Sequence, residues 1–493
     1  MEVRRYGHAA LLIAPSSSPL DLAIAIRALD DERIAEVVPA AETVLVTVHD
    51  RADLAEVEAL VASLAVTPVE PPAEAAAVVD IEVVYDGPDL EAVATASRLT
   101  VDEVVRRHTA TIYRCRFCGF SPGFSYLEGL DPSLVLPRRS VPRTSVTAGS
   151  VAIAGAFAAV YPTASPGGWH LLGRTTAVLW DADHPQPALV PPGAAVRFRA
   201  VDVLPTTPQR PPTRRRDHRE DAASVLAVAA AGWRSTVQDG GRSGLAHLGV
   251  PRAGAVDEAQ RRRLNRLVGN PDGAAVIETL GGLVFDVLAA VVVADSASGA
   301  VTTLPSGATL QVDPGPGETW ATLAVRGGVS VPARLGSRSW DSLSQLGPPP
   351  LRVGDRVAVG PDPRTPVGEL APPAPLDPVV DVTIGPRADW FTDEAIATLL
   401  GAEWTVSSDL SRVGVRLIGP ILDRTEATIG RELPSEGLVT GAIQVPPSGQ
   451  PIVMLADHPT TGGYPVIAVV DDDQLAKVVR RRPGDTLRFR GRT

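Results

Sequence analysis

Three glycine loops carry side chains and backbone groups that can hold an anion. Successive N–H groups in such turns form a concave nest for phosphate or carboxylate, and a neighbouring arginine strengthens it. The alternative is a hairpin bend in which only glycine fits. The three loops are Ser165-Pro166-Gly167-Gly168-Trp169-His170, Gln238-Asp239-Gly240-Gly241-Arg242 and Thr460-Thr461-Gly462-Gly463-Tyr464.

Residues 119–123 match the nucleophile elbow of serine hydrolases, but their chemistry does not fit it. In an elbow the N–H after the serine donates to the oxyanion, and here Pro122 follows Ser121 and has no N–H. We therefore predict a turn, either lining a cleft or purely structural.

Cys115 and Cys118 have a spacing that is found in metal and redox sites. They fall in an alternating strand pattern, where an offset of three places the two thiols on opposite faces. Buried, reduced cysteines are the better interpretation. The eight histidines are scattered, so the sequence predicts no metal site.

Lys477 is the only lysine in the chain. A phosphate-binding P-loop, a biotin carrier and a pyridoxal phosphate enzyme each need a lysine in a specific context, and Lys477 lies in none of them. Biotin therefore has no attachment site here.

The elements that position these residues are mostly short strands separated by glycine and proline turns. A small βαβα unit is predicted at the start, with strands over 9–14 and 43–49, and Thr100 with Glu103 forms a capping box on a later helix. Proline-rich stretches predict linkers or breaks at 68–77, 205–222 and 366–378.

A turn followed by a closing strand is used three times, at 195–198, 353–357 and 483–489. Two of these units also share a strand, a long hairpin and a Gly-Gly-aromatic sequence. The repetition predicts duplicated β-barrels.

Composition narrows the classes of protein further. The 493 residues carry 46 basic and 57 acidic side chains, a net charge of −11, which argues against a nucleic-acid binder. The arginine runs 261–263 and 480–482 are interpreted as solvated faces. No 18-residue apolar stretch or export signal is present, so we expect no membrane association and a cytoplasmic location.

Long segments of the chain resemble a known pair of proteins. Residues 113–130, 142–155 and 165–174 are similar to the small subunit of the bacterial 5-oxoprolinase and allophanate hydrolase-related family, which is also known as a sporulation-kinase inhibitor. The chain also resembles the larger companion subunit, at residues 236–242, 247–251, 265–271 and 435–465. The matches follow one another, so the resemblance implies a natural fusion of two subunits.

The resemblance implies an α+β, mainly β fold in which a small α+β domain precedes three cyclophilin-like β-barrels. The expected boundaries are 1–78 for the small domain, 79–204 for the first barrel, 205–222 for a linker, and 223–365 and 366–493 for the other barrels.

The resemblance also implies a component of an ATP-dependent 5-oxoprolinase, which opens the lactam of 5-oxoproline to glutamate. ATP with Mg²⁺ would act at the level of a complex with a separate partner protein, similar to the third or A component of 5-oxoprolinase. The substrate is a small acid, and self-association of the chain is left open. Two alternatives are a biotin-dependent urea or amide carboxyltransferase component and a non-enzymatic histidine kinase inhibitor.

Lactam opening needs cationic groups and N–H nests for anions, and a carboxylate or imidazole to move protons. Each acid could equally cap a turn or pair with an arginine. The candidate acid-base groups are His108, Asp239, Glu278, Glu436 and Asp457. The candidate anion or substrate holders are Arg143, Gly167, Gly168, Gln238, Arg242, Gln444, Thr460, Thr461, Gly462, Gly463 and Tyr464.

The chain departs from the family pattern at two positions. Gly240 stands where leucine is common and Ala253 where serine or glycine is common, so neither side chain can be assigned to catalysis. The sequence also contains no biotin carboxylase segment and no familiar ATP motif.

Overall fold

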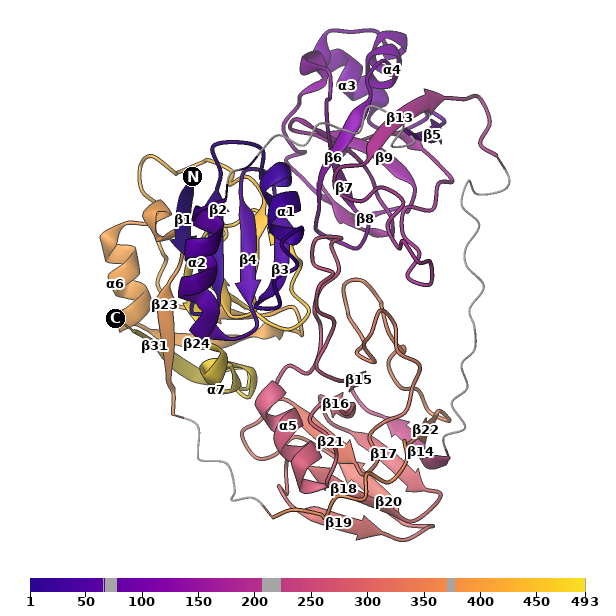
Figure 1. Ribbon diagram of the computed structural model, residues 1–493, viewed down its shortest axis with the longest axis vertical. Helices are drawn as coiled ribbons and strands as arrows, with labels where there is room; N and C mark the ends of the chain where they lie inside the picture. Colours follow the sequence, from indigo (N-terminus) through magenta and orange to yellow (C-terminus); the bar gives the residue numbers. More distant parts are fainter. Residues whose placement is uncertain (65, 67–77, 206–222, 370–376, 493) are drawn as a thin grey trace.

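The computed structural model describes residues 1–64, 66, 78–205, 223–369 and 377–492 (Figure 1). The predicted linkers at 68–77 and 205–222 lie outside these ranges except for residue 205, as do residues 370–376 of the predicted break. Strands dominate, which confirms the predicted fold class. The boundaries between the domains stay predictions. Among the described helices, none is long and apolar enough to cross a membrane.

The N-terminal unit is an antiparallel sheet in the order β1-β2-β4-β3. Strands β2 and β4 are almost continuous apolar runs, so both faces of the sheet need to be covered. The predicted βαβα order is present, and β1 and β3 add the two edges. The elements are β1 (Glu2–Arg5), β2 (Ala10–Ala14), α1 (Pro19–Arg27), β3 (Ile34–Pro39), β4 (Val44–Val48), a 3-10 turn (Arg51–Asp53) and α2 (Leu54–Ala62).

The two faces of this sheet are covered by different parts of the chain. Helices α1 and α2 share a core with one face. The other face packs on the C-terminal barrel, although the first barrel follows it in sequence (Figure 1). A Cβ added to Gly437 would lie 2.4 Å from Cβ of Leu45, which shows how closely the two surfaces approach. The shared core comprises Tyr6, Ala10, Leu12, Val38, Leu45, Leu438, Ala442, Ile452, Met454, Val466 and Val469.

The first barrel is a seven-stranded sheet in the order β12-β9-β10-β7-β6-β13-β5. Backbone hydrogen bonds between Val84 and Arg174, 2.9 and 3.0 Å long, join its two ends. The elements are β5 (Val79–Val83), α3 (Leu90–Ser97), α4 (Val101–Thr109), β6 (Tyr113–Cys118), β7 (Ser125–Glu128), a 3-10 turn (Pro132–Leu134), β8 (Arg143–Val146), β9 (Ser150–Ala154), β10 (Phe157–Val160), β11 (Ser165–Gly167), β12 (His170–Arg174) and β13 (Ala195–Ala200).

Helix α4 begins at the predicted cap, because the Thr100 hydroxyl accepts a hydrogen bond from the Glu103 N–H at 3.2 Å. The prediction for the two cysteines is wrong in one respect. A register shift between Cys115 and Phe117 breaks the alternation of β6, so the two sulfur atoms lie 4.0 Å apart in one core instead of on opposite faces. Both thiols are free and buried.

The second barrel is divided into two sheets, β20-β17-β14-β22 and β15-β16-β21-β18-β19, which share one core. The elements are β14 (Ser224–Ala231), β15 (Ser235–Gln238), α5 (Glu258–Leu267), β16 (Val276–Thr279), β17 (Leu283–Val287), β18 (Val291–Asp295), β19 (Val301–Leu304), β20 (Thr309–Val312), β21 (Ala321–Val325) and β22 (Arg356–Ala358).

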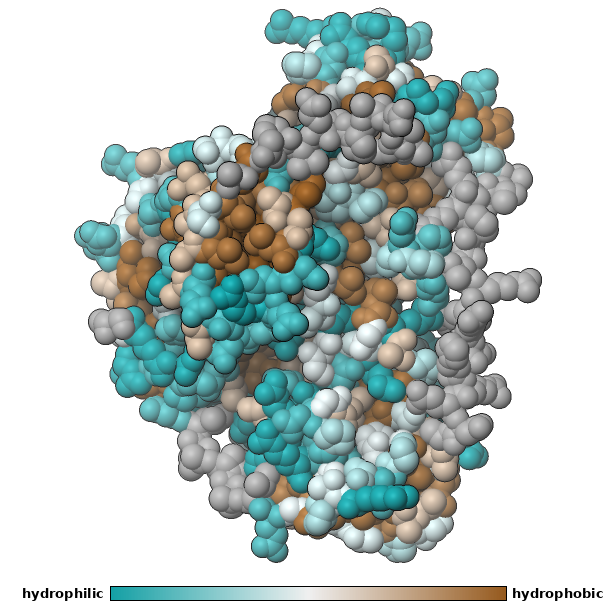
Figure 2. Space-filling model, viewed as in Figure 1, coloured by the Kyte–Doolittle hydropathy of each residue, from teal (hydrophilic) through white to brown (hydrophobic). Residues whose placement is uncertain are grey.

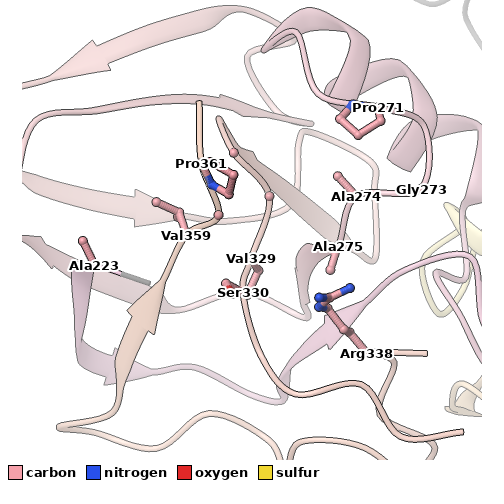
Figure 3. Close-up of a pocket in the computed structure, with 13 residues that line it drawn as sticks. Ala223, Pro271, Gly273, Ala274, Ala275, Val329, Ser330, Arg338, Val359 and Pro361 are labelled. Carbon is pink, nitrogen blue, oxygen red and sulfur yellow. The ribbon is translucent and has the colours of Figure 1, made fainter. Parts of the chain in front are cut away.

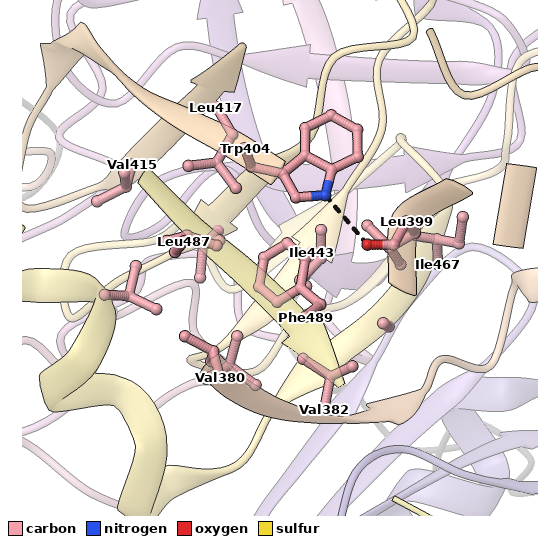
Figure 4. Packing of buried hydrophobic residues seen from close by; sticks show 14 of the residues in the cluster. Val380, Val382, Leu399, Trp404, Val415, Leu417, Ile443, Ile467, Leu487 and Phe489 are labelled. Carbon is pink, nitrogen blue, oxygen red and sulfur yellow. Dashed lines mark hydrogen bonds between the residues drawn. The ribbon is translucent and has the colours of Figure 1, made fainter. Parts of the chain in front are cut away.

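The third barrel is closed, in the order β23-β30-β27-β28-β25-β24-β31. Trp404 fills its core and donates its indole N–H to the Leu399 carbonyl at 3.0 Å (Figure 4). The elements are β23 (Val379–Ile384), a 3-10 turn (Ala388–Trp390), α6 (Asp393–Gly401), β24 (Glu403–Leu410), β25 (Gly414–Ile418), β26 (Glu436–Gly437), β27 (Ala442–Gln444), β28 (Ile452–Met454), β29 (Thr461–Gly462), β30 (Val466–Val470), a 3-10 turn (Asp472–Gln474), α7 (Leu475–Val479) and β31 (Thr486–Gly491).

The three repeated closing segments form β13, β22 and β31. Strands β13 and β31 each pair with one parallel and one antiparallel neighbour, β5 and β6 in the first barrel and β23 and β24 in the third. The first and third barrels are therefore closed in the same way.

The arginine runs are only partly solvated, which corrects the prediction. The outer face of α5 is hydrophilic in Figure 2, but Arg261 is buried and pairs with Glu258 at 2.5 Å. Arg480 pairs with Asp257 at 2.6 Å, and the guanidinium of Arg482 donates to the Glu318 carbonyl at 2.8 Å. The second run therefore joins the third barrel to the second.

Replacing Gly437 by alanine should loosen the N-terminal unit from the third barrel. The new methyl group would overlap Leu45, and overpacking of this kind costs about 1–3 kcal/mol. The thermal midpoint measured by scanning calorimetry should fall. In the control Gly401→Ala, the added Cβ has no neighbour within 4 Å, and the midpoint should be unchanged. Equal midpoints for the two variants would contradict the proposed packing.

Candidate functional site

Segments from both halves of the chain meet beside the first barrel. A Cβ added to Gly119 would lie 2.1 Å from the hydroxyl oxygen of Thr461. The Gly123 N–H donates to the Leu248 carbonyl at 3.0 Å, and Gly249 lies against the Ser121 carbonyl. The glycine turn of the first half thus contacts two motifs of the second half.

A true anion nest lies in this junction, but a carboxylate of the protein fills it. The backbone N–H groups of Gly244 and Ala246 donate to the two oxygens of Glu36 on β3, the latter at 3.2 Å. Burial raises the pKa of Glu36, and these N–H groups oppose the rise. The N-terminal unit therefore fixes the loop that carries Leu248 and Gly249.

A cavity of about 140 Å³ opens in the first barrel next to this junction. Its aromatic rings pack edge to face: Phe124 lies 5.1 Å from Tyr161 and 5.4 Å from Trp169 between ring centroids. Such packing fixes the rings in place. The lining residues are Phe120, Phe124, Tyr126, Arg138, Tyr161, Pro166, Gly167, Gly168 and Trp169.

Phe120 holds a strained backbone conformation at the wall of this cavity. Its φ is +66°, and the Ser121 N–H donates to the Gly119 carbonyl at 2.7 Å, which makes a γ-turn of the rare positive-φ kind. Strain of this kind clusters at binding and active sites. Ser121 itself is buried, and its hydroxyl has no hydrogen-bond partner among the described residues. These features support a turn that lines a cleft.

Among the described residues that line the cavity, Arg138 alone is charged, and no sequence motif indicated it. The predicted anion holder, Arg143, instead donates to Asp89 at 2.8 Å, and Arg139 donates to the same oxygen at 2.7 Å. Within the described ranges, Arg138 forms no ion pair. The charge pattern alone cannot distinguish Arg138 from Arg139 and Arg143, because the difference depends on which of them Asp89 contacts in the folded protein.

A second cluster of predicted residues lies buried between the second and third barrels. Arg412 binds Asp457 through two bonds of 2.9 and 3.0 Å, contacts Glu278, and donates to the Gly254 carbonyl at 2.5 Å. Burial raises the pKa of Glu278, while Arg412 opposes that rise. The guanidinium links the two barrels.

Asp239 and Arg242 belong to the same buried region. The Asp239 carboxylate accepts hydrogen bonds from the Ser337 and Ser339 hydroxyls at 2.6 and 2.7 Å, and from the Gly241 N–H at 2.9 Å. Arg242 donates to the carbonyls of Arg334 and Ser339. The Asp239 and Arg242 side chains of the second glycine loop therefore make their hydrogen bonds within the protein.

Asp341 adds a carboxylate that no sequence motif indicated. One of its oxygens accepts the N–H groups of Leu343 and Ser344, at 2.7 and 3.0 Å, and the other has no partner in the described structure. Burial, reinforced by the negative charge of Asp457, raises the pKa of Asp341 to about 6.

The structure separates His108 from every other predicted residue. It lies in the core of the first barrel, its ring 4.6 Å from that of Phe198, with Tyr85 hydrogen-bonded to its Nδ1 at 2.7 Å. Burial lowers its pKa to about 3. Because His108 is neutral and buried away from the other predicted residues, we assign it no role in the candidate site.

Most of the remaining predicted residues lie on the third-barrel side of the junction and bind other parts of the protein. Glu436 pairs with Arg387 beneath the N-terminal sheet, and burial raises the pKa of Glu436. Gln444 donates to the Tyr464 carbonyl and Gln238 to the Trp340 carbonyl, each at 3.0 Å. The structure thus places Gly167 and Gly168 at the cavity, Asp239, Gln238, Arg242, Glu278 and Asp457 in the charged cluster, and Glu436, Gln444, Thr460, Thr461, Gly462, Gly463 and Tyr464 on the third-barrel side of the junction.

A larger cavity of about 790 Å³ lies at one end of the second barrel (Figure 3). Its described walls are glycine, alanine, valine and proline residues with one serine, Ser330, and one charged residue, Arg338. It holds none of the predicted site residues. We place the candidate site at the smaller cavity, where aromatic rings, a cation and a strained turn converge. Among the described residues, no group of three His, Cys, Asp or Glu could hold a metal ion.

Family models match both halves of the chain. The carboxyltransferase domain, subdomains C and D, matches residues 1–190, and subdomains A and B match residues 248–491. The crystal structure of TTHA0988 is 32% identical, with a TM-score of 0.86, covering 99% of this chain and 100% of that one. The chain therefore belongs to the carboxyltransferase-domain family.

Two curated relatives divide the chain between them. The B subunit of 5-oxoprolinase from Escherichia coli is 46% identical over 123 residues, 24% of this chain and 56% of that protein. The C subunit of the E. coli enzyme is 34% identical over 283 residues, 54% of this chain and 90% of that protein. Urea amidolyase of Lachancea kluyveri is 32% identical over 306 residues, 54% of this chain and 17% of that enzyme. The chain thus spans just over half of the first relative and nearly all of the second.

Gly167→Ala and Gly168→Ala form a matched pair that tests the cavity wall. A Cβ on Gly167 would lie 2.1 Å from the Tyr161 hydroxyl oxygen, whereas the nearest atom to a Cβ on Gly168 is 3.8 Å away. Gly167→Ala should displace Tyr161, cost about 1–3 kcal/mol, and alter the near-ultraviolet circular dichroism of the aromatic rings. Gly168→Ala should retain the wild-type spectrum and thermal midpoint. The same response from both variants would contradict this packing.

Asp341→Asn should stabilise the protein, but only at neutral and higher pH. The folded state favours the neutral form of Asp341, so the wild type loses stability as pH rises from about 4 to about 6 and keeps that deficit above pH 6. The variant removes the deficit, on the order of 1–3 kcal/mol. Its gain in thermal midpoint should be clear at pH 7.5 and should vanish towards pH 4. In the control Asp286→Asn an exposed carboxylate is changed in the same way, and the thermal midpoint should stay close to that of the wild type. A gain that is independent of pH would rule out a buried, neutral Asp341.

Proposed function

We propose that this chain combines the B and C components of an ATP-dependent 5-oxoprolinase, which opens the lactam of 5-oxoproline to glutamate. The observation that carries the proposal is the junction between its halves, in which the turn at Gly119 of the B-like half meets Thr461 of the C-like half. Similarity to both components in one chain supports the same function.

An unstrained lactam resists water, so its carbonyl must be activated before the ring opens. In this proposal ATP, with Mg²⁺, transfers its terminal phosphoryl group to the carbonyl oxygen and leaves as ADP. Water then attacks the activated carbon, the ring C–N bond breaks, and phosphate departs to leave glutamate. A separate A-type partner protein completes the active complex. The role of this chain is to hold the acid in place for these steps. The rigid aromatic wall and Arg138 are suited to that role.

Carboxyl transfer from biotin is the second candidate, and the similarity to urea amidolyase favours it. It would need a biotinylated carrier from another protein, because Lys477 is the only lysine and lies in helix α7. Histidine kinase inhibition remains a prediction for the first half alone. The interlocking of the halves argues against it, because an inhibitor would not need the second half.

Turnover by the full chain with its A-type partner tests the proposal. With ATP, Mg²⁺ and 5-oxoproline, glutamate should form only when both proteins are present, and omitting ATP should abolish it. Adding avidin, which removes biotin, should not change the rate. Glutamate formation by the partner alone, or none by the pair, would overturn the proposal. A loss of activity with avidin would favour carboxyl transfer.

A further inference from the structure

We infer that the cavity of the first barrel binds the small cyclic acid itself, with the ring among the aromatic side chains and the carboxylate on Arg138. The inference rests on the proposed function and assigns substrate binding to this chain and not to its partner. It also predicts that the cavity discriminates against the opened product.

The size of the cavity fits a small ring. Pockets for drug-sized ligands usually span about 300–1,000 Å³, and this one is about 140 Å³. A nucleotide is too large for it. Aromatic rings surround the space, with Tyr126 lying 5.5 Å from Trp169 and 5.2 Å from Phe124. A flat five-membered ring can contact these faces without a change in the wall.

The charges of the cavity fit a single carboxylate. Arg139 and Arg143 both pair with Asp89, and among the described residues that line the cavity Arg138 is the one charged group, so it is the cation that a ligand there would meet. Its side chain is exposed at the mouth, where an entering carboxylate would meet it first. A guanidinium can bind a carboxylate through two parallel hydrogen bonds.

Tyr161 offers a donor for the lactam carbonyl. Tyr161 lines the cavity with its hydroxyl beside Gly167, and a phenol can donate its proton to an acceptor. Burial raises the pKa of Tyr161 to about 12, which keeps that proton in place at neutral pH. The lining therefore offers the ligand both a cation and a neutral donor.

Glutamate fits the same cavity poorly. Ring opening creates a second carboxylate and an ammonium group, and the lining holds no second cation and no carboxylate to pair with them. Burying an unpaired charge among aromatic rings is costly. The cavity should therefore release the product after the ring opens.

Direct binding to the full chain, without ATP or partner, tests the inference. Isothermal titration calorimetry should show saturable binding of 5-oxoproline, with glutamate at least about tenfold weaker because of its unpaired charges. Cyclopentanecarboxylate, which has the ring and the carboxylate but lacks the amide, should bind more weakly than 5-oxoproline. Free biotin should not compete.

Arg138→Gln and Arg174→Gln are the matched variants. Arg138 has no ion pair to lose, so its variant should fold normally by circular dichroism while binding 5-oxoproline about tenfold more weakly. Arg174 lies in the same barrel, is exposed and pairs with Asp86 at 2.7 Å, and its variant should bind as the wild type does.

Three outcomes would overturn the inference: no saturable binding to the wild-type chain, equal binding by the Arg138 variant, or displacement of the ligand by biotin. These outcomes are separable from failure of the proposed function. Turnover with the partner and an unchanged KM in Arg138→Gln would overturn the inference alone. Binding as expected without turnover would overturn the proposed function alone.

Discussion

The structure depends on the burial of both faces of the N-terminal sheet. Strands β2 and β4 carry apolar side chains on either side, and the two helices of the unit cover only one face. Leaving the other face in water would expose a large apolar patch. The third barrel covers it, and the unit in turn presents Glu36 to the loop that touches the first barrel. The hydrophobic contact therefore positions the N-terminal unit on the third barrel, and the Glu36 hydrogen bonds extend the connection to the loop that touches the first barrel.

The charged cluster between the second and third barrels works in a different way. Four carboxylates, those of Asp239, Glu278, Asp341 and Asp457, are buried with two guanidiniums, those of Arg242 and Arg412. Buried ion pairs of this kind add little net stability, yet removing one partner is strongly destabilising. Because the acids outnumber the cations, the cluster favours a proton on one of them, and Asp341 is the carboxylate with an unpartnered oxygen. We interpret the cluster as a specific contact that fixes the second barrel against the third, and we assign ligand binding to the cavity of the first barrel.

Local patterns predicted the parts of the fold that local chemistry decides. The cap at Thr100, the three closing strands and the mainly β class follow from turn chemistry, strand periodicity and repetition. Features that depend on tertiary contacts escaped. A register shift in β6 makes the prediction for Cys118 wrong. Arg143 pairs with Asp89, which is distant in sequence, whereas Arg138 lines the cavity. Arg480 pairs with Asp257 on the second barrel. The predicted acids Asp239, Glu278, Glu436 and Asp457 are buried partners of arginine and serine side chains. Periodicity cannot show which arginine an acid reaches.

Both chain termini lie in the same part of the molecule (Figure 1). The polypeptide starts on the third barrel, passes through the other two and returns to where it began, so the path is nearly circular. The N-terminal unit and the third barrel also share a hydrophobic core, so we expect the assembly to tolerate a break between the first and second barrels. Gene fission at that point would leave two products that bind each other through the same surfaces. This topology gives a physical reason why one chain can contain segments similar to both the B and the C subunit of E. coli 5-oxoprolinase.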